Sequence, residues 1–287
     1  MKLNPIYISF NILKEINDDS KISIHSRFET SINLKINTKI VNLSYNENIL
    51  PPYGIVLRQM DFHKILDKVG AGIVPCIHED NICFEDLKIA LKNTKEIYYS
   101  SLDKHENNLN QSGEIWRYLL DILIDSKKQN GFDLSNDFLI NPTDDSLEIE
   151  KKIEELVSFF KKNSDESIIK YFLGRGRGLT PSGDDFIVGI MSVFSCYKVF
   201  MEPMEKLSNF INKFGNEYTN DISLSFLESA SQGLFSRNIL NILSNIENEK
   251  EVKIDIDNLL YYGETSGVDL LLGIIFAYKI MDRSVSI

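Results

Sequence analysis

The chain has 287 residues, of which 43% are hydrophobic, and its 31 basic and 42 acidic side chains give a formal net charge of −11. This hydrophobic content can supply a buried core, so we expect a folded globular protein of one large or two ordinary domains. The acidic balance argues against a sequence-independent nucleic-acid binder, because such binding depends on clustered cations, and it gives no indication of a membrane partner.

The beginning of the chain does not resemble a signal peptide, because Pro5 and several polar residues interrupt its apolar core. The longest apolar stretch, residues 186–200, is shorter than the roughly 20 residues of a membrane-spanning helix, so it predicts a buried core helix. The three cysteines, Cys76, Cys83 and Cys196, are too few for a disulfide scaffold. We therefore expect a cytoplasmic protein.

Apolar residues alternate with polar ones in three runs between residues 20 and 60, which predicts strands with one buried face. The alternating residues are Ile22, Ile24 and Phe28, then Ile32, Leu34 and Ile36, then Val41, Leu43 and Tyr45. Pro51 and Pro52 interrupt regular structure, and a short helix is expected from about Asp61 to Val69. Further short apolar runs up to residue 84 complete a β-rich N-terminal part.

The hydrophobic period changes after residue 110, where apolar residues recur at spacings of three and four. Helical faces of this kind occur within residues 115–123, 149–160 and 207–214. The polar segments 101–113 and 130–146 are candidate connections. We therefore predict an α+β fold, with a β-rich domain over residues 1–105 and a mostly α-helical domain over residues 106–287.

The helical part contains a short repeat, SGxDxxxGI. Its two copies are SGDDFIVGI at 182–190 and SGVDLLLGI at 266–274. A serine three residues before an aspartate, ahead of an apolar run, is the capping-box pattern. In this structural interpretation Ser182 and Ser266 cap two helices, while Asp185 and Asp269 bond back and favour the positive helix ends.

Capping leaves the glycines of the repeat unexplained, because glycine costs about 0.5–1 kcal/mol relative to alanine inside a helix. Gly183 and Gly267 in the first turns would let a ligand reach backbone N–H groups. Gly189 and Gly273 would let two helix backbones approach each other closely. We predict that the two helices cross at these glycines, with their N-termini facing a shared space that favours a phosphate or a carboxylate.

The segment that precedes the first copy, GRGRG at 174–178, strengthens the anion-binding interpretation. Gly174, Gly176 and Gly178 can adopt positive φ and present consecutive N–H groups, and Arg175 and Arg177 offer planar guanidinium donors. The segment is not a Walker loop, because no lysine follows the last glycine. It is not a dinucleotide fingerprint either, because the glycine spacing differs.

Three segments together resemble the signature blocks of the AllH-like family, which is best known through a subunit of oxamate carbamoyltransferase. They are GRGRGLTPSGDDFIVG, TNDISLSFLESASQG and GETSGVDLLLG, and they span about residues 170–275. The resemblance implies a subunit of an enzyme that interconverts oxalurate with oxamate plus carbamoyl phosphate in allantoin-derived nitrogen catabolism. It also implies a small anionic substrate and association with other subunits.

The resemblance implies site residues at the signature positions, and Arg175 and Arg177 fall at variable positions within it. The signature positions are Gly174, Gly176, Gly178, Thr180, Ser182, Gly183, Asp184 and Asp185 in the first block and Ser266, Gly267 and Asp269 in the last. From spacing alone, Thr219 and Ser223 share one helical face, where they either cap the helix or line the pocket.

Three aspartates are the candidate catalytic residues, Asp184, Asp185 and Asp269. No cofactor is assigned, although these carboxylates could instead hold Mg²⁺ bridging to phosphate oxygens. Because Asp185 fits the capping pattern and Asp184 has no counterpart in the second copy, Asp184 is the better candidate for a ligand or general base. Helix N-termini and guanidinium groups would supply the donors that carbamoyl transfer requires.

Two other functions remain open, a noncatalytic assembly subunit whose repeat helices only pack, and a Mg²⁺-dependent hydrolase of a phosphorylated or amide substrate. All four histidines precede residue 110, which argues against a Ser/His/Asp triad. The run CIHEDNIC at 76–83 matches no zinc pattern and is interpreted as strand residues.

Overall fold

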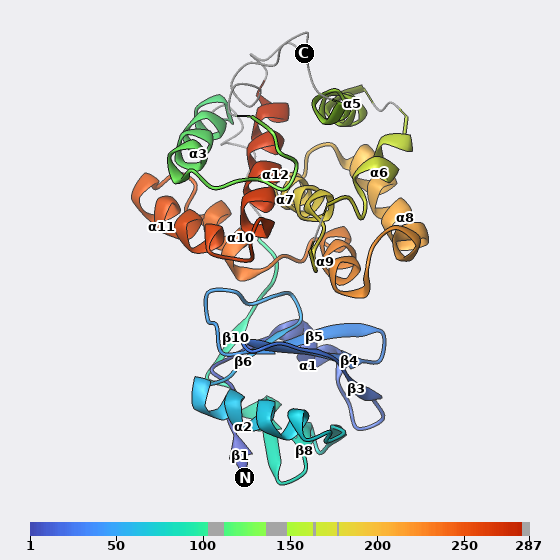
Figure 1. Ribbon diagram of the computed structural model, residues 1–287, viewed down its shortest axis with the longest axis vertical. Coiled ribbons are helices and arrows are strands. Elements are labelled where there is room, and N and C mark those ends of the chain that lie inside the picture. The colour runs from blue at the N-terminus through green and yellow to red at the C-terminus, as the bar shows by residue number, and fades with distance from the viewer. Residues whose placement is uncertain (103–111, 136–147, 163–164, 177, 283–287) are drawn as a thin grey trace. The chain divides into compact units, whose positions relative to one another are not determined.

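The computed structural model divides into two compact units, Met1–Ser100 and Ser101–Ile287 (Figure 1). The residues described are 1–102, 112–135, 148–162, 165–176 and 178–282. The strands lie in the first unit and the second is built from helices, which confirms the predicted α+β fold. The domain boundary predicted at residue 105 and most of both predicted connections fall outside the described residues and stay predictions.

Strands dominate the N-terminal unit. They are β1 (Lys2–Leu3), β2 (Tyr7–Ser9), β3 (Ile22–Arg27), β4 (Ser31–Ile36), β5 (Lys39–Ser44), β6 (Gly54–Val56), β7 (Cys76–His78), β8 (Asn81–Phe84), β9 (Leu87–Ala90) and β10 (Glu96–Tyr98). One sheet has the strand order β10-β2-β6-β5-β4-β3, and the other has the order β1-β9-β8-β7. Two helices, α1 (Phe10–Glu15) and α2 (Gln59–Gly70), and a short 3₁₀ turn at Leu91–Asn93 complete the unit.

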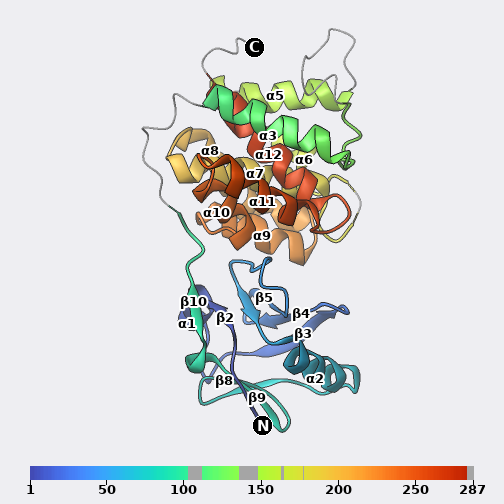
Figure 2. The same ribbon diagram turned by 90° about the vertical axis from the view of Figure 1, so that its left-hand side faces the viewer.

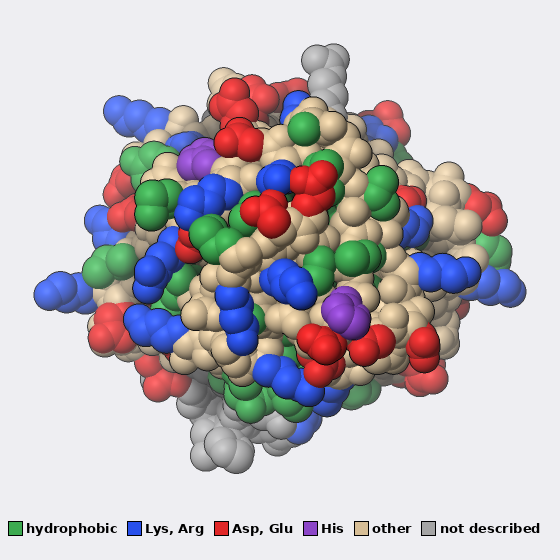
Figure 3. Space-filling view, turned by 90° about the horizontal axis from the view of Figure 1, so that it is seen from below, with side chains coloured by type: hydrophobic (Ala, Val, Ile, Leu, Met, Phe, Trp, Pro, Cys, Tyr) green, Lys and Arg blue, Asp and Glu red, His purple; other side chains and the backbone are tan. Residues whose placement is uncertain are grey.

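The core of the N-terminal unit lies between α2 and the two sheets. The strands β3, β4 and β5 form an antiparallel meander, as their alternating pattern predicts. The helix α2 turns Phe62, Ile65 and Val69 into the same cluster as Ile32 and Leu34 of β4. The face of the unit seen in Figure 3 carries lysine and arginine side chains among acidic and apolar ones.

The helical unit contains nine described helices. They are α3 (Ser112–Ser126), α5 (Glu148–Lys162), α6 (Ser167–Phe172), α7 (Ser182–Tyr197), α8 (Met201–Tyr218), α9 (Asp221–Ser231), α10 (Arg237–Ser244), α11 (Glu249–Leu260) and α12 (Ser266–Met281). The helices α3, α5 and α8 bury the apolar faces that their spacing of three and four predicts. Among the described helices, none is long and apolar enough to cross a membrane.

The helices α7 and α12 form the centre of this unit (Figures 1 and 2). Almost every residue of both is buried, so they lack the polar face of a surface helix. The helices α3, α5 and α11 pack on α12, and α6, α8, α9 and α10 pack on α7. The two SGxDxxxGI segments therefore begin the two most enclosed helices of the fold.

Candidate functional site

The helices α7 and α12 meet where each carries its internal glycine. A Cβ atom added to Gly189 would lie 2.3 Å from the carbonyl oxygen of Leu270 and 2.9 Å from the Cα atom of Gly273. A Cβ atom on Gly273 would lie 2.2 Å from the carbonyl oxygen of Phe186. No side chain fits at either position. The predicted crossing at the two glycines is confirmed, and its reciprocal contacts show that both copies share one geometry.

The first-turn glycines contact backbone as well. A Cβ atom on Gly183 would lie 1.9 Å from the carbonyl oxygen of Phe172, and one on Gly267 would lie 2.0 Å from that of Leu259. The space expected for a ligand beside these residues is thus occupied by a preceding segment of the chain. The absence of a side chain serves packing here.

The amides of the same two glycines already donate hydrogen bonds. The N–H of Gly183 donates to the carbonyl of Arg175 at 2.8 Å, and the N–H of Gly267 donates to the carbonyl of Tyr262 at 3.0 Å. Each bond joins the first turn of its helix to the segment that immediately precedes that helix. Direct contact of these amides with a substrate stays a prediction. The argument that the missing side chains leave room for a ligand is wrong, because backbone of this chain fills that space.

The capping-box prediction is wrong. The helices begin at Ser182 and Ser266 themselves, and no side-chain cap bond forms at Pro181 or Thr265, the residues that precede them. The hydroxyl of Ser266 lies 2.7 Å from that of Thr180, so the serine of α12 reaches across to the segment before α7. The motif therefore joins two helices to each other rather than capping each one by itself.

The aspartates of the motif are also shared between the helices. Burial raises the pKa of Asp185 well above its usual range, and the hydroxyls of Ser266 and Thr180 oppose this shift. Burial likewise raises the pKa of Asp269, against the amide of Gly131 and the hydroxyls of Ser182 and Thr265. Each carboxyl group thus lies near the serine of the other helix. We call Thr180, Ser182, Asp185, Ser266 and Asp269 the helix junction.

Two carboxyl oxygens of the helix junction have no partner. The Oδ2 atoms of Asp185 and Asp269 are buried and form no hydrogen bond within the described residues. The two side chains are only 6% and 0% exposed. After burial and the opposing hydroxyls, the charges of Asp269 and Asp184 raise the pKa of Asp185 further. Because an unpaired buried charge is costly, the helix junction favours protonated carboxyl groups, which can donate an O–H.

Asp184 is fully engaged instead. Its Oδ1 accepts a hydrogen bond from the N–H of Gly174 at 2.8 Å, and its Oδ2 accepts bonds from the hydroxyls of Thr219 and Ser223, the latter at 2.6 Å. Burial raises the pKa of Asp184, and these three bonds oppose the shift. Asp184 ties two segments to α7, namely the beginning of α9 and the loop that carries Gly174, Gly176 and Gly178, which we call the glycine loop. Among the described residues, the carboxyl oxygens without a partner belong to Asp185 and Asp269. The sequence favoured Asp184 as the aspartate that contacts a ligand, but in the structure Asp185 and Asp269 are the ones with an unpartnered oxygen.

The three glycines of the loop before α7 adopt positive φ, as expected. The φ angles are 71° for Gly174, 113° for Gly176 and 109° for Gly178. A Cβ atom on Gly174 would collide with the carbonyl of Tyr218, whereas one on Gly178 would meet nothing nearer than 3.8 Å. The loop is therefore anchored at its first glycine and open at its last, since Gly176 and Gly178 are exposed.

The two arginines of the loop are placed differently by the structure. The guanidinium group of Arg175 stacks over the ring of Tyr171, 4.0 Å from the ring centroid, and the residue is exposed. Arg177 lies outside the described residues. The side-chain amide of Asn220, which caps α9, donates to the carbonyl of Leu179 at 2.8 Å and fixes the end of the loop.

The segment that contains the glycine loop and the helix junction matches a known family model. Residues 172–278 match the family described as oxamate carbamoyltransferase subunit AllH. The chain has an AllH-like helical region. The match covers the glycine loop, the helix junction and the helices between, and it leaves out the N-terminal unit. No solved structure matches the chain.

Two residues that lie beside the helix junction were missed from the sequence. The N–H of Gly131 donates to Asp269 Oδ1 at 2.8 Å, and a Cβ atom at Gly131 would lie 1.9 Å from the hydroxyl oxygen of Ser182. Tyr262 lies close to Asp185, because its pKa is raised by burial and then by the charge of that carboxyl group. Gly131 lies in a connecting segment, where no local pattern distinguishes it.

The carboxyl groups of the AllH-like region do not cluster like metal ligands. Among the residues that the structure describes, no three His, Cys, Asp or Glu side chains are arranged to hold a metal ion. Asp184 faces the glycine loop and α9, while Asp185 and Asp269 face each other's helices. Asp184 is therefore hydrogen-bonded through both of its oxygens, whereas Asp185 and Asp269 each keep one oxygen without a partner in the described part of the chain.

Proposed function

We propose that the chain is a subunit of a carbamoyltransferase-type enzyme related to oxamate carbamoyltransferase, and that the helix junction binds its small anionic substrate, carbamoyl phosphate or oxamate. The observation that carries the proposal is the coincidence of two features. The AllH family match covers the helix junction, and there Asp185 and Asp269 each bury an oxygen without a partner within the described residues.

The physical basis of the proposal is a protonated pair of carboxyl groups between two helix N-termini. Helix N-termini carry partial positive charge that favours an anion. Ionised Asp185 and Asp269 would cancel that effect, whereas protonated carboxyl groups donate hydrogen bonds to a carboxylate or carbonyl oxygen. The raised pKa of both groups, caused first by burial, favours the protonated form.

The glycine loop supplies a second set of donors in this proposal. The exposed guanidinium of Arg175 and the backbone N–H groups around Gly176 and Gly178 would hold the departing phosphate. Thr180 and Ser266 are the half-buried members of the helix junction, and we propose that the substrate enters past them. The carbonyl end of carbamoyl phosphate would then lie toward the aspartates, where donors favour the charge that develops on oxygen.

A second candidate function is a noncatalytic assembly subunit. It is favoured by the use of Gly183, Gly189, Gly267 and Gly273, all of which pack against backbone of this chain. The AllH family is described as a subunit, so in both versions we propose that the chain acts with other subunits of the same enzyme.

Calorimetric titration separates the two candidates. The full chain, alone and with its partner subunits, would be titrated with carbamoyl phosphate, inorganic phosphate and oxamate, with and without Mg²⁺. We expect binding of at least one of these anions, and its loss in Asp185→Ala/Asp269→Ala with the fold retained by circular dichroism. The absence of binding to the chain and to the assembled enzyme would leave only the assembly role.

A further inference from the structure

The N-terminal unit contains a pair of cysteines that the proposed function does not use. Cys76 of β7 and Cys83 of β8 are directly opposite each other in an antiparallel hairpin. Opposite residues project their side chains from the same face of the sheet, with Cα atoms roughly 4.5–5.5 Å apart. A disulfide requires Cα atoms roughly 4.4–6.8 Å apart, so the register alone satisfies its spacing.

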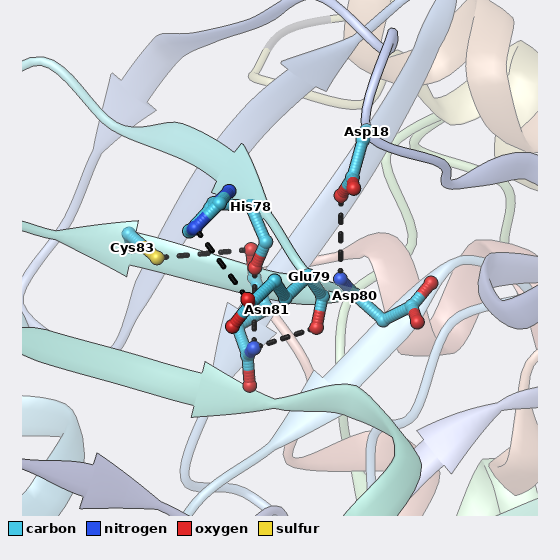
Figure 4. Close-up of polar contacts among 6 residues, drawn as sticks. All are labelled: Asp18, His78, Glu79, Asp80, Asn81 and Cys83. Carbon is cyan, nitrogen blue, oxygen red and sulfur yellow. Dashed lines mark hydrogen bonds and ion pairs between the residues drawn. The ribbon is translucent and has the colours of Figure 1, made fainter.

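The two thiols interact with each other. Burial raises the pKa of the Cys83 thiol, and the charge of Cys76 and a hydrogen bond with its side chain contribute to the shift in the same direction. The Sγ atom of Cys83 also lies 3.9 Å from the carbonyl oxygen of Asn81. Figure 4 draws this contact as a dashed line. The side chains therefore approach each other without any rearrangement of the strands.

The pair is asymmetric in its access to solvent. Cys76 is exposed on β7, which is one of the two edge strands of its sheet, whereas Cys83 is only 5% exposed. A reagent in solution meets Cys76 first, whereas burial shields Cys83 from it. One cysteine is thus suited to attack a reagent and the other to resolve the product.

The hairpin is not arranged as a metal centre. His78 and Asn81 flank the turn, and Figure 4 shows that the His78 ring pairs with Glu79, at 3.9 Å between Nε2 and Oε1. No group of three potential ligands is present among the described residues, the hairpin included.

We propose that Cys76 and Cys83 form a thiol–disulfide exchange site whose substrate is a small-molecule disulfide such as oxidised glutathione. The Cys76 thiolate attacks one sulfur of the substrate, which forms a mixed disulfide and releases one glutathione thiolate. Cys83 then loses its proton to solvent and attacks the Cys76 sulfur, which releases the second glutathione. Two protein thiols are oxidised to one disulfide, and one substrate disulfide is reduced to two thiols.

Cys196 provides an internal control for this site. It lies within α7 and is only 2% exposed. The full chain would be equilibrated with mixtures of reduced and oxidised glutathione, quenched with acid, alkylated after denaturation and analysed by peptide mass mapping. We expect the loss of two alkylatable thiols of the three and a Cys76–Cys83 crosslink, with Cys196 carrying no glutathione and no crosslink.

Single variants test the order of the two steps. In Cys83→Ser we expect one stable glutathione adduct on Cys76, and in Cys76→Ser neither adduct nor crosslink, while Cys196→Ser behaves as wild type. Three free thiols in wild type under oxidising mixtures would overturn the proposal. A wild-type adduct on Cys76 that never resolves, or Cys76 crosslinks only between two chains, would overturn it as well. None of these measurements depends on binding at the helix junction, so the two proposals fail separately.

Discussion

The two SGxDxxxGI segments lie side by side as α7 and α12, use the same residue types in the same way, and differ at the residue before the shared aspartate. Asp184 in the first segment accepts three hydrogen bonds, whereas Val268 in the second is a buried apolar residue. The shared residues build the helix crossing and the helix junction. Only the first segment holds the glycine loop, through the hydrogen bond from the Gly174 N–H to Asp184.

The crossing glycines are expected to show the largest effect. In Gly189→Ala/Gly273→Ala each new Cβ atom would lie within 2.3 Å of a carbonyl oxygen of the other helix. We expect a loss of more than about 4 kcal/mol in the free energy of unfolding, enough to unfold many domains. Chemical denaturation followed by circular dichroism measures it.

Gly215→Ala is the matched control for the crossing. It also lies inside a helix, but a Cβ atom there meets the end of the flexible Leu224 side chain, at 2.5 Å. We expect its free energy of unfolding to stay within about 1 kcal/mol of wild type. Equal losses in the control and in the crossing variant would show that the helices are not in backbone contact.

The first-turn glycines sharpen the comparison between the two segments. Gly183→Ala and Gly267→Ala bring a Cβ atom to 1.9 and 2.0 Å from a carbonyl oxygen. Because the two environments match, we expect similar losses of about 3 kcal/mol in the free energy of unfolding. The two melting curves should nearly coincide. A variant at Gly183 that folds as well as wild type would mean that the space beside it is open.

A variant of Asp184 tests the attachment of the glycine loop, which the second segment lacks. Asp184→Ala leaves a buried hydroxyl of Ser223, the hydroxyl of Thr219 and the N–H of Gly174 without their acceptor. We expect a loss of about 2–3 kcal/mol in the free energy of unfolding, and protease cleavage within the glycine loop at enzyme levels that spare wild type. Cleavage that is no faster than in wild type would contradict the attachment.

The acid pair predicts a smaller effect that depends on pH. Because burial raises the folded-state pKa of Asp185, the protonated group stabilises the fold at low pH, and this contribution is lost as pH rises above about 4 through the folded-state pKa. Asp185→Asn cannot ionise. We expect its stability relative to wild type to increase with pH, by on the order of 1 kcal/mol. Denaturation midpoints between pH 4 and 8 measure this, and a constant difference would refute it.

Features that depend on local periodicity could be predicted from the sequence. The alternation of apolar and polar residues in β4 and β5 predicted the meander. The paired glycines predicted the crossing, because glycine destabilises a helix and close backbone contact is the main physical reason to place it at the same position in two buried helices. The helix junction could not be predicted in detail. Ser266 bonds to Thr180 rather than to its own first turn, and a capping pattern does not reveal a partner so far along the chain.

The order of the aspartates escaped prediction for a similar reason. Asp184 is engaged because the beginning of α9 brings Thr219 and Ser223 to it, and nothing in the residues next to Asp184 encodes that contact. Gly131 reaches Asp269 from a connecting segment. Only the assembled fold shows which carboxyl oxygens remain free.

The central claim is that protonated Asp185 and Asp269 hold an anion between two helix N-termini. Its most direct measurement is the affinity for oxamate and carbamoyl phosphate between pH 5.5 and 8.5 by calorimetry in buffers of different ionisation enthalpy. The account predicts weaker binding as pH rises, proton uptake on binding, and binding independent of pH in Asp185→Asn/Asp269→Asn, whose amides still donate. Binding that strengthens with pH, or that releases protons, would contradict it.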